Sequence, residues 1–540
     1  MAILTSPSNE RPMKIAETDR RGAFAGFSWW GHWLAIWWIA GVCASLVWAV
    51  DRGAAFRAAM DSIQSREIQA HVQYLADEKR EGREAGTPGG YAAGDYLCRR
   101  LAALRLPGAG PGGDYLQPFS PNFRNVLAKV GGGDPALAGE TIVVSAHYDH
   151  VGRGQKGNSL GQIGEIHPGA DDNASGVSAL LEIAEAFTIL AEPPRRTVLF
   201  AFWDAEEKGM LGSKHWIAQP TLPLESVRLL VNMDMVGRLR NDRLVVYGAR
   251  TGYGLRRWVA AHNESAMLID FSWNALANAD HFPFFSNNIP FLTLHTDLHE
   301  QYHRPTDTAD LILPDGIRRV ARLAFSLVYD LANADQTPAF RPAAREESEA
   351  TRRSLAEQPP HFPERLGVRW SAESAGERGV RLTGVSAQSA AERAGLRVGD
   401  RIIEFAGRAI RSSDDFLGAV FTAPASTSAA VLRPDAPAPV RIPIMLDGKP
   451  LRVGIVWRVD DAEPGAAILT AVVPGSPAAR ANLQVDDRIY QINGRGFSSE
   501  EELAQLLGTL PSPIHLVVER KGRMYNVELR LEAVPLRRAA

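Results

Sequence analysis

The residues best suited to chemistry lie in the stretch TIVVSAHYDH and in the later segment GADDNASG. A β-branched apolar run ends in His147 and Asp149, and a Gly-rich turn further on carries Asp171, Asp172 and Asn173. A histidine and clustered carboxylates in turns after hydrophobic strands form a donor set suited to zinc or a harder divalent cation. We therefore interpret this region as half of a two-zinc hydrolase site, whose other half should lie downstream.

Metal-binding side chains recur where three further predicted strands end. In open α/β sheets ligands bind at the carboxyl ends of the strands, so these side chains should meet at one edge of the sheet. Aspartate is also common at helix N-caps. This alternative could explain any one of these side chains, but it explains the recurrence after several strands less well. The side chains that follow these strands are Asp204, Glu206, Glu207, Asp234, His295, His299 and His303.

The chain from residue 124 onward alternates apolar strands with amphipathic helices. This alternation predicts an α/β fold with a mixed, largely parallel sheet sandwiched by helices. The helix after the Gly-rich turn shows Val177, Leu180, Leu181 and Ala184 at the i, i+3, i+4, i+7 spacing of a buried stripe. The clearest strands are expected at 141–146, 197–203, 229–233, 243–247 and 290–294.

The N-terminal region predicts a membrane anchor. Residues 1–26 are polar, and residues 27–50 contain no Asp, Glu, Lys or Arg. As a helix, these 24 residues (50 − 27 + 1) would span ~36 Å, enough for a hydrocarbon core of ~30 Å. The run is long for a signal peptide and no clean A-x-A site follows it, so an uncleaved anchor is favoured over a cleaved signal or a buried helix. Basic residues before the run favour a cytoplasmic tail at 1–26 and place the rest of the chain in the periplasm or outside the cell.

Composition narrows the remaining possibilities. A chain of 540 residues suggests two to four domains, and its net charge of -3 gives no reason to expect nucleic acid as a partner. The two cysteines, Cys43 and Cys98, lie in an apolar run and a predicted helix, so a disulfide framework is not expected.

The second half of the chain contains an internal repeat. Residues 336–362 form a charged linker bracketed by prolines, and two similar segments then follow at an offset of 87 residues (454 − 367). Two copies are too few for a solenoid and indicate two tandem modules, at 363–448 and 449–536. The repeated turn is Leu366-Gly367-Val368 in the first copy and Val453-Gly454-Ile455 in the second.

Residues 60–335 resemble the di-zinc aminopeptidase family that includes the secreted bacterial leucyl aminopeptidases. Distant relatives of that family are glutamate carboxypeptidase, the transferrin receptor and glutaminyl cyclase. Its ordered motifs are all present as AHYDH, GADDNASG, DAEEKGMLGS, NMDM and YHRPTDT. The resemblance implies a zinc-exopeptidase-like fold, two zinc ions per chain and peptides as substrates.

The resemblance also implies a ligand set. His147 and Asp234 should bind one zinc ion, and Glu207 and His303 should bind the other. Asp172, the middle acid of GADDNASG, should bridge the two ions. A bridging carboxylate would hold two cations a few ångströms apart while partly neutralising them.

Further roles follow from the same motifs. Glu206 should be the general base, which takes a proton from the attacking water and returns it to the leaving amine. Asp149 should accept the imidazole N–H of His147 and so fix the tautomer of that ligand. A cis peptide bond is implied between Asp172 and Asn173. Asp280, His281 and Tyr302 are expected near the substrate, although core packing is an equal alternative for the ANADHFPFF segment.

Both C-terminal modules resemble bacterial-type PDZ domains. Their Φ-G-Φ turns are followed in both copies by the pattern S-x-A-x-x-A-x-L-x-x-x-D-R-I. In such domains the turn binds the carboxylate of a C-terminal peptide, which adds a strand to the sheet edge. Docking on the peptidase or mediating assembly remains the alternative for these modules.

The favoured interpretation is therefore a membrane-anchored, extracytoplasmic zinc aminopeptidase with two PDZ domains. A second hypothesis is also an enzyme, a glutaminyl cyclase, which uses one zinc ion and attack by the substrate amine. A binding protein on an inactive peptidase fold is a third hypothesis. The intact set of predicted ligands, together with Glu206, argues against it.

Overall fold

The computed structural model describes residues 52–275, 277–357, 362, 364–371 and 378–531. Within these ranges no helix is long and apolar enough to cross a membrane, and the predicted anchor at 27–50 lies outside them. The described residues from Ala55 onward belong to one compact unit.

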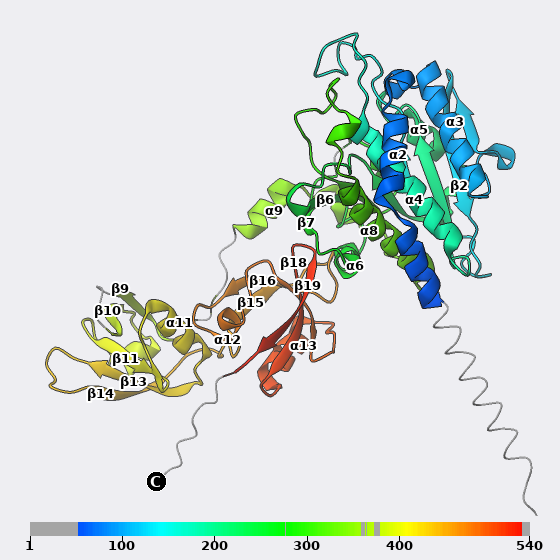
Figure 1. Cartoon of the computed structure of the whole chain (residues 1–540). Helices are drawn as coiled ribbons and strands as arrows, with labels where there is room; N and C mark the ends of the chain where they lie inside the picture. The colour runs from blue at the N-terminus through cyan, green and yellow to red at the C-terminus, as the bar shows by residue number, and fades with distance from the viewer. Residues whose placement is uncertain (1–51, 276, 358–361, 363, 372–377, 532–540) are drawn as a thin grey trace, which may run out of the picture. The chain divides into compact units, whose positions relative to one another are not determined.

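An eight-stranded mixed sheet forms the centre of the peptidase-like half (Figure 1). Its strand order is β1-β2-β4-β3-β5-β8-β6-β7. The pairs β3–β4, β3–β5, β5–β8 and β6–β7 are parallel, whereas β1–β2, β2–β4 and β6–β8 are antiparallel. The strands are β1 Leu116–Phe119, β2 Phe123–Val130, β3 Thr141–His147, β4 Thr197–Trp203, β5 Val227–Met233, β6 Arg243–Tyr247, β7 Leu268–Ser272 and β8 Phe291–His295.

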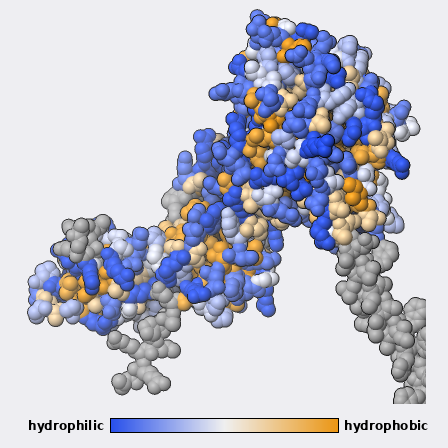
Figure 2. All heavy atoms as spheres, in the orientation of Figure 1, coloured by the Kyte–Doolittle hydropathy of each residue, from blue (hydrophilic) through white to orange (hydrophobic). Residues whose placement is uncertain are grey.

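Helices cover both faces of this sheet, because its central strands are apolar on both sides. On β4, Phe200 and Phe202 join the core cluster under α4 and α8, whereas Trp203 joins the cluster on the opposite face with Trp216 and Phe284. The predicted arrangement, a sheet sandwiched by helices, is therefore confirmed. Hydrophilic side chains cover most of the molecular surface seen in Figure 2. The helices are α2 Ser65–Leu75, α3 Pro88–Ala103, α4 Gly176–Ile189, α5 Leu211–Ala218, α6 Leu255–His262, α7 His281–Ser286, α8 Pro314–Asn333 and α9 Glu349–Ala356.

Two smaller antiparallel sheets follow in the chain. Their strand orders are β14-β13-β11-β10-β9, with β12 paired to β11, and β15-β16-β17-β18-β19. Each packs its own apolar core against one short and one longer helix. The elements are β9 Val368–Ser371, β10 Val380–Val385, α10 Ala390–Arg393, β11 Arg401–Phe405, β12 Arg408–Ala409, α11 Ser413–Thr422, β13 Ser426–Leu432, β14 Val440–Met445, β15 Ile455–Arg458, β16 Ala467–Val472, α12 Pro477–Arg480, β17 Arg488–Ile492, α13 Glu500–Thr509, β18 Ile514–Arg520 and β19 Arg523–Leu529.

A carboxyl group is buried between α2 and α4. Glu182 is 1% exposed, and its Oε2 accepts the N–H of Gln64 at 2.8 Å. Its Oε1 lies 3.6 Å from Nε2 of His71. Burial raises the pKa of Glu182 to about 8 and lowers the pKa of His71 to about 4. Near pH 7 both groups are therefore mostly neutral, and their proximity does not amount to an ion pair.

Glu182→Gln is expected to stabilise the protein at neutral and alkaline pH. The folded-state pKa of Glu182 lies above its ordinary value of 4.5, so the free energy of unfolding falls as pH rises from 4.5 to about 8. At pH 7 this loss is roughly 3 kcal/mol, and an isosteric amide would avoid most of it. Urea denaturation should show a small gain at pH 5 and a gain of about 2–3 kcal/mol at pH 8. The exposed Glu67→Gln on α2 is the control, and an equal effect of Glu182→Gln at both pH values would contradict the prediction.

Candidate metal centre

Three predicted ligands lie at the ends of neighbouring strands. His147 is the last residue of β3, Asp234 directly follows β5, and Glu207 comes four residues after the end of β4. Strand β3 lies between β4 and β5 in the sheet. The topology thus brings together side chains that are far apart in the sequence.

Asp172 lies between two groups of these side chains. Its Oδ1 is 3.3 Å from Nε2 of His147, which is 3.4 Å from Oδ1 of Asp234. Its Oδ2 is 3.1 Å from Nε2 of His303, which is 3.2 Å from Oε2 of Glu207. Each group has the donor atoms to hold a metal ion, and Asp172 belongs to both.

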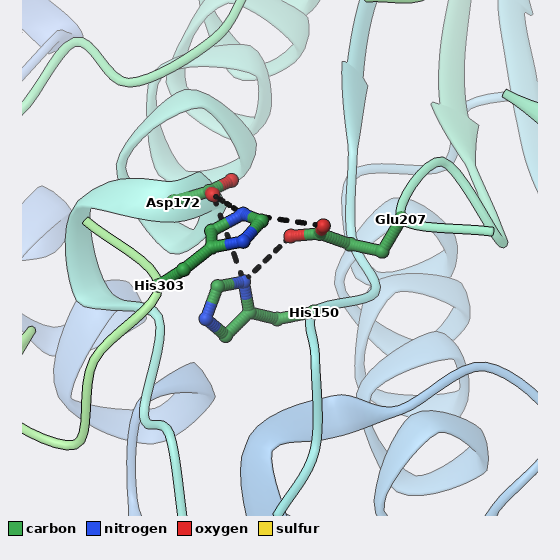
Figure 3. Close-up of side chains that lie close together, drawn as sticks. All are labelled: His150, Asp172, Glu207 and His303. Carbon is green, nitrogen blue, oxygen red and sulfur yellow. Dashed lines mark hydrogen bonds and ion pairs between the residues drawn. The ribbon is translucent and has the colours of Figure 1, made fainter. Parts of the chain in front are cut away.

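The second group contains a histidine that sequence reasoning did not select. Nδ1 of His150 lies 2.9 Å from Oε1 of Glu207 and 3.8 Å from Oδ2 of Asp172. Figure 3 shows His150 and His303 turned toward these two carboxylates. His150 belongs to the same AHYDH motif as His147, so the sequence does contain this histidine in a ligand-rich segment. Nothing in the spacing of the motif distinguished it as a metal ligand.

The electrostatics of the site fit a bound cation. Burial by itself lowers the pKa of His303, but its contacts with Asp172 and Glu207 outweigh that effect and raise the pKa to about 11. Burial likewise lowers the pKa of His147, and its contacts with Asp149 and Asp172 raise it well above the ordinary value. The side chains therefore carry surplus negative charge, which divalent cations would neutralise. Imidazole and carboxylate donors in this combination suit zinc.

A buried arginine joins two of the loops that carry the candidate ligands. Arg83 is 0% exposed. Its guanidinium donates to backbone carbonyls on both sides of the site, so it fixes the AHYDH turn against the GADDN turn. The sequence shows only a Gly-rich turn around this residue and gives no sign of the role. The carbonyl acceptors are those of Leu75 (2.9 Å), Tyr148 (3.0 Å), Pro168 (2.6 Å) and Gly169 (2.9 Å).

The turn that contains Asp172 is held in place through its backbone N–H groups. Oδ2 of Asp307 accepts the N–H groups of Asp171 at 2.9 Å and of Asp172 at 3.1 Å. Gly169 has φ 60°, and a Cβ there would lie 2.2 Å from the carbonyl oxygen of Asp172, so only glycine fits. The peptide bond between Asp172 and Asn173 is cis, as the resemblance implied.

The carboxylate of Asp149 contacts the chain that carries Glu206. It accepts the N–H of Glu206 at 3.0 Å and the N–H of Glu207 at 3.4 Å. Its distance to Nδ1 of His147 is 3.7 Å, whereas the backbone carbonyl of Asp149 lies 3.2 Å from that nitrogen. Asp149 therefore positions the backbone of the two glutamates more directly than it positions the imidazole.

A pocket opens beside these groups. Glu206, His281 and Tyr302 line it together with the five predicted ligands. His281 stacks on Phe291 with ring centroids 4.3 Å apart. Asp280 is buried behind the pocket and accepts the hydroxyl of Ser213, so it does not line the cavity.

The Φ-G-Φ turns of the two smaller domains have matching geometry. Gly367 has φ 74° and Gly454 has φ 81°. A Cβ at these positions would lie 2.3 Å from Cβ of Ser389 and 2.1 Å from Cβ of Ser476, the residues that cap α10 and α12. The Gly454 N–H already donates to the carbonyl of Leu451 at 2.8 Å. Leu366 and Val453 are buried, and Val368 and Ile455 begin the strands β9 and β15.

Curated proteins similar to this chain include two aminopeptidases. Aminopeptidase YwaD of Bacillus subtilis (strain 168) is 26% identical over 210 residues, which cover 37% of this chain and 43% of that protein. Leucine aminopeptidase 1 of Arthroderma otae is 26% identical over 256 residues, which cover 43% of this chain and 64% of that protein. The chain thus spans about half the length of the curated relatives it matches.

Similar solved structures include a zinc aminopeptidase and a glutaminyl cyclase. The zinc aminopeptidase, from Bacillus subtilis, has a TM-score of 0.41 and 16% identity and covers 52% of this chain and 98% of its own. The cyclase, from Bacteroides thetaiotaomicron, has a TM-score of 0.41 and 20% identity and covers 50% of this chain and 98% of its own. With TM-scores below 0.5, these likenesses do not discriminate between functions.

Matches to two families cover both halves of the chain. Residues 125–328, which contain every candidate metal ligand, match peptidase family M28. Residues 381–428 and 468–520 match the PDZ domain family. The central part of this chain is therefore similar to peptidase family M28, and two segments similar to PDZ domains follow it.

Proposed function

We propose that this chain is a zinc-dependent aminopeptidase that removes N-terminal residues from peptides and uses two zinc ions. The observation that carries the proposal is that Asp172 is shared by two imidazole–carboxylate groups beside a pocket that also contains Glu206. The M28 family match and the aminopeptidase relatives support the same reaction.

The side chains divide naturally between two ions. Bound zinc would polarise the scissile carbonyl and lower the pKa of the attacking water. One ion would be held by His147 and Asp234, the other by Glu207 and His303 with His150 beside them, and both by Asp172.

Proton transfer falls to Glu206. It takes a proton from the attacking water and gives it to the nitrogen of the breaking C–N bond, so the amine leaves neutral. Asp149 keeps Glu206 in place through the backbone N–H, and His281 and Tyr302 contact the substrate from the pocket wall.

The chain from residue 55 onward allows a direct test. It would be given free and N-acetylated peptides, with and without chelator, while zinc per chain is measured. The proposal expects trimming of free-amine peptides only, loss of activity with chelator and about two zinc ions per chain. Cyclisation of peptides with N-terminal Gln, together with about one zinc ion per chain, would instead support the hypothesis of a glutaminyl cyclase. No turnover of any peptide would favour a binding protein on a peptidase fold.

We also propose a location for the active domains. The uncharged run at 27–50 would anchor the chain in a membrane, with the peptidase and PDZ domains in the periplasm or outside the cell. Protease added to intact spheroplasts should then degrade these domains. Protection of the whole chain until the cells are lysed would contradict this placement.

The PDZ domains are proposed to bind C-terminal peptides. β9 and β15, which follow the Φ-G-Φ turns, are edge strands of their sheets and can accept an added strand. A peptide with a free C-terminus should bind, and its C-terminal amide should bind far more weakly in a fluorescence-anisotropy titration. Equal binding of the two peptides would remove this role.

A further inference from the structure

The second PDZ domain packs closely against the peptidase domain. The N–H of Gly254 donates to the carbonyl of Ala462 at 2.9 Å, and the N–H of Ile269 donates to the carbonyl of Lys521 at 2.8 Å. A Cβ added to Gly522 would lie 2.5 Å from Cβ of Ile269, so only a glycine allows this approach. The contact surface on the PDZ side includes the β15–β16 loop, the β18–β19 turn and Glu519 of β18, which binds Arg256.

Three arginines of the peptidase domain bind carboxylates of the PDZ domain across this contact: Arg250 binds Asp460, Arg256 binds Glu519 and Arg341 binds Asp461. The guanidinium of Arg250 forms two hydrogen bonds to Glu347, at 2.6 and 2.7 Å, and two to Asp460 of the PDZ domain, both at 2.9 Å. It also stacks 3.7 Å from the ring centroid of Trp273, and its side chain is 10% exposed. A planar guanidinium held bidentately on both sides and stacked on an aromatic ring has one preferred position.

Asp460 is itself fixed within the PDZ domain. It accepts a hydrogen bond from Arg458 at 2.9 Å and another from the N–H of Ala462 at 3.0 Å. Contacts with Arg250 and Arg458 hold its pKa well below the ordinary value, against the effect of burial. The PDZ domain therefore presents a rigid, charged acceptor to Arg250.

Arg250 lies close in the chain to the wall of the catalytic pocket. It comes three residues after Tyr247, the last residue of β6, which lines the pocket. Thr251, the residue after Arg250, is anchored to β8, because its hydroxyl donates to the carbonyl of Phe291 at 3.1 Å and accepts the Phe291 N–H at 2.9 Å. The ring of Tyr247 meets the ring of His295, another pocket residue, edge to face at 6.1 Å.

Trp273, whose ring stacks on Arg250, is also connected through the chain to the pocket wall. Trp273 follows β7, the parallel neighbour of β6, in which Ser272 is paired with Tyr247. Further along this chain Asn278 and Ala279 line the pocket. Two segments of the wall therefore lead to Arg250, and neither of them contains a candidate metal ligand.

We propose that the second PDZ domain positions the pocket wall of the peptidase through Arg250, so that the Asp460–Arg250 contact sets the affinity for substrate. Arg250 is a positioning residue in this scheme, since it does not line the pocket and acts through Tyr247 and Trp273. The inference rests on the proposed peptidase activity.

Asp460→Asn in the full chain tests the proposal. The substitution is isosteric and lies outside the pocket, and it removes the charge that holds Arg250. KM for a trimmed peptide should rise at least fivefold while kcat changes less than twofold and zinc content is unchanged. Amide hydrogen exchange in the 248–254 loop should become faster.

The matched control is Asp400→Asn in the first PDZ domain. Asp400 is also buried and bound by an arginine, Arg433, at 3.1 Å within its own domain. It should leave KM unchanged, and an equal rise there would show a general loss of stability and overturn the proposal. A double variant, Asp460→Asn with Arg250→Gln, should raise KM no further than Arg250→Gln alone, because both changes break one contact. Independent, additive effects would overturn the route through Arg250.

The two proposals fail in different ways. If the parent chain trims no peptide, the proposed function fails, and hydrogen exchange still reports on the contact. Faster exchange at 248–254 in Asp460→Asn alone would then support the positioning role, and unchanged exchange would overturn it. If the parent is active, an unchanged KM in Asp460→Asn overturns the proposal.

Discussion

Glu206→Gln should lower kcat by about 10³-fold, because general-base catalysis contributes about 10²–10⁴-fold and glutamine cannot accept the proton. Zinc content and KM should stay close to the parental values. The backbone of residue 206 is held by the carboxylate of Asp149, so the isosteric side chain keeps its place beside the pocket. Steady-state kinetics with metal analysis of the same sample would measure this.

A second glutamate provides the control for this prediction. Glu84 pairs with Lys208 at 2.8 Å, and Glu84→Gln removes a carboxylate outside the pocket lining. Its kcat should remain within about twofold of the parent, since partly exposed ion pairs contribute about 1 kcal/mol or less. A Glu206→Gln enzyme that keeps more than a tenth of the parental kcat would rule out the general-base role. Loss of zinc in that variant would instead make Glu206 a ligand.

Arg83→Met should lower the free energy of unfolding by about 3–5 kcal/mol, because each buried acceptor left without a partner costs about 1–3 kcal/mol. Four backbone carbonyls would lose their donor in the interior. Two of them, those of Tyr148 and Gly169, belong to turns that present candidate ligands, so zinc should also be lost more readily. Urea denaturation and competition with a chelator would measure the two effects.

Arg153→Met is the matched control. Arg153 lies just after the AHYDH motif, is 57% exposed and pairs with Glu81 at 2.9 Å, so its loss should cost less than about 1 kcal/mol. If Arg83→Met does not fold, Arg83→Lys retains the charge without the fork and should show an intermediate loss of zinc. Parental stability and zinc retention in both Arg83 variants would show that the arginine is dispensable.

The ends of the apolar strands were predictable because burial on both faces leaves a continuous run of apolar residues. The runs at 197–203 and 243–247 match β4 and β6 residue for residue. The last predicted strand is shifted by one residue. It was expected at 290–294, whereas β8 begins at Phe291 and ends at His295. Donor side chains after such runs meet at one edge of the sheet, which made a metal site there predictable. The choice of the five ligands came from the resemblance to the aminopeptidase family, since Asp172 and His303 do not directly follow a strand.

Supporting residues were not predictable, because their partners are distant in the chain and their types are ordinary. Arg83 acts on carbonyls as far away as Gly169, and no side-chain pattern marks a backbone acceptor. Asp149 was assigned to an imidazole two residues away, whereas its shorter contact is to an N–H that arrives from β4. His150 approaches Glu207 only once β3 and β4 are paired.

The sequence by itself determined the apolar runs, the donor residues after them and the two repeated domains, because these depend on local periodicity and spacing. The tertiary structure decided which donors share Asp172, which residues brace them and where the second PDZ domain contacts the peptidase. The Arg250–Asp460 contact joins residues 210 positions apart, and its partners are surface-type residues in either domain taken alone. Only the docking of two folded surfaces buries these charges together, so no local pattern could reveal the contact.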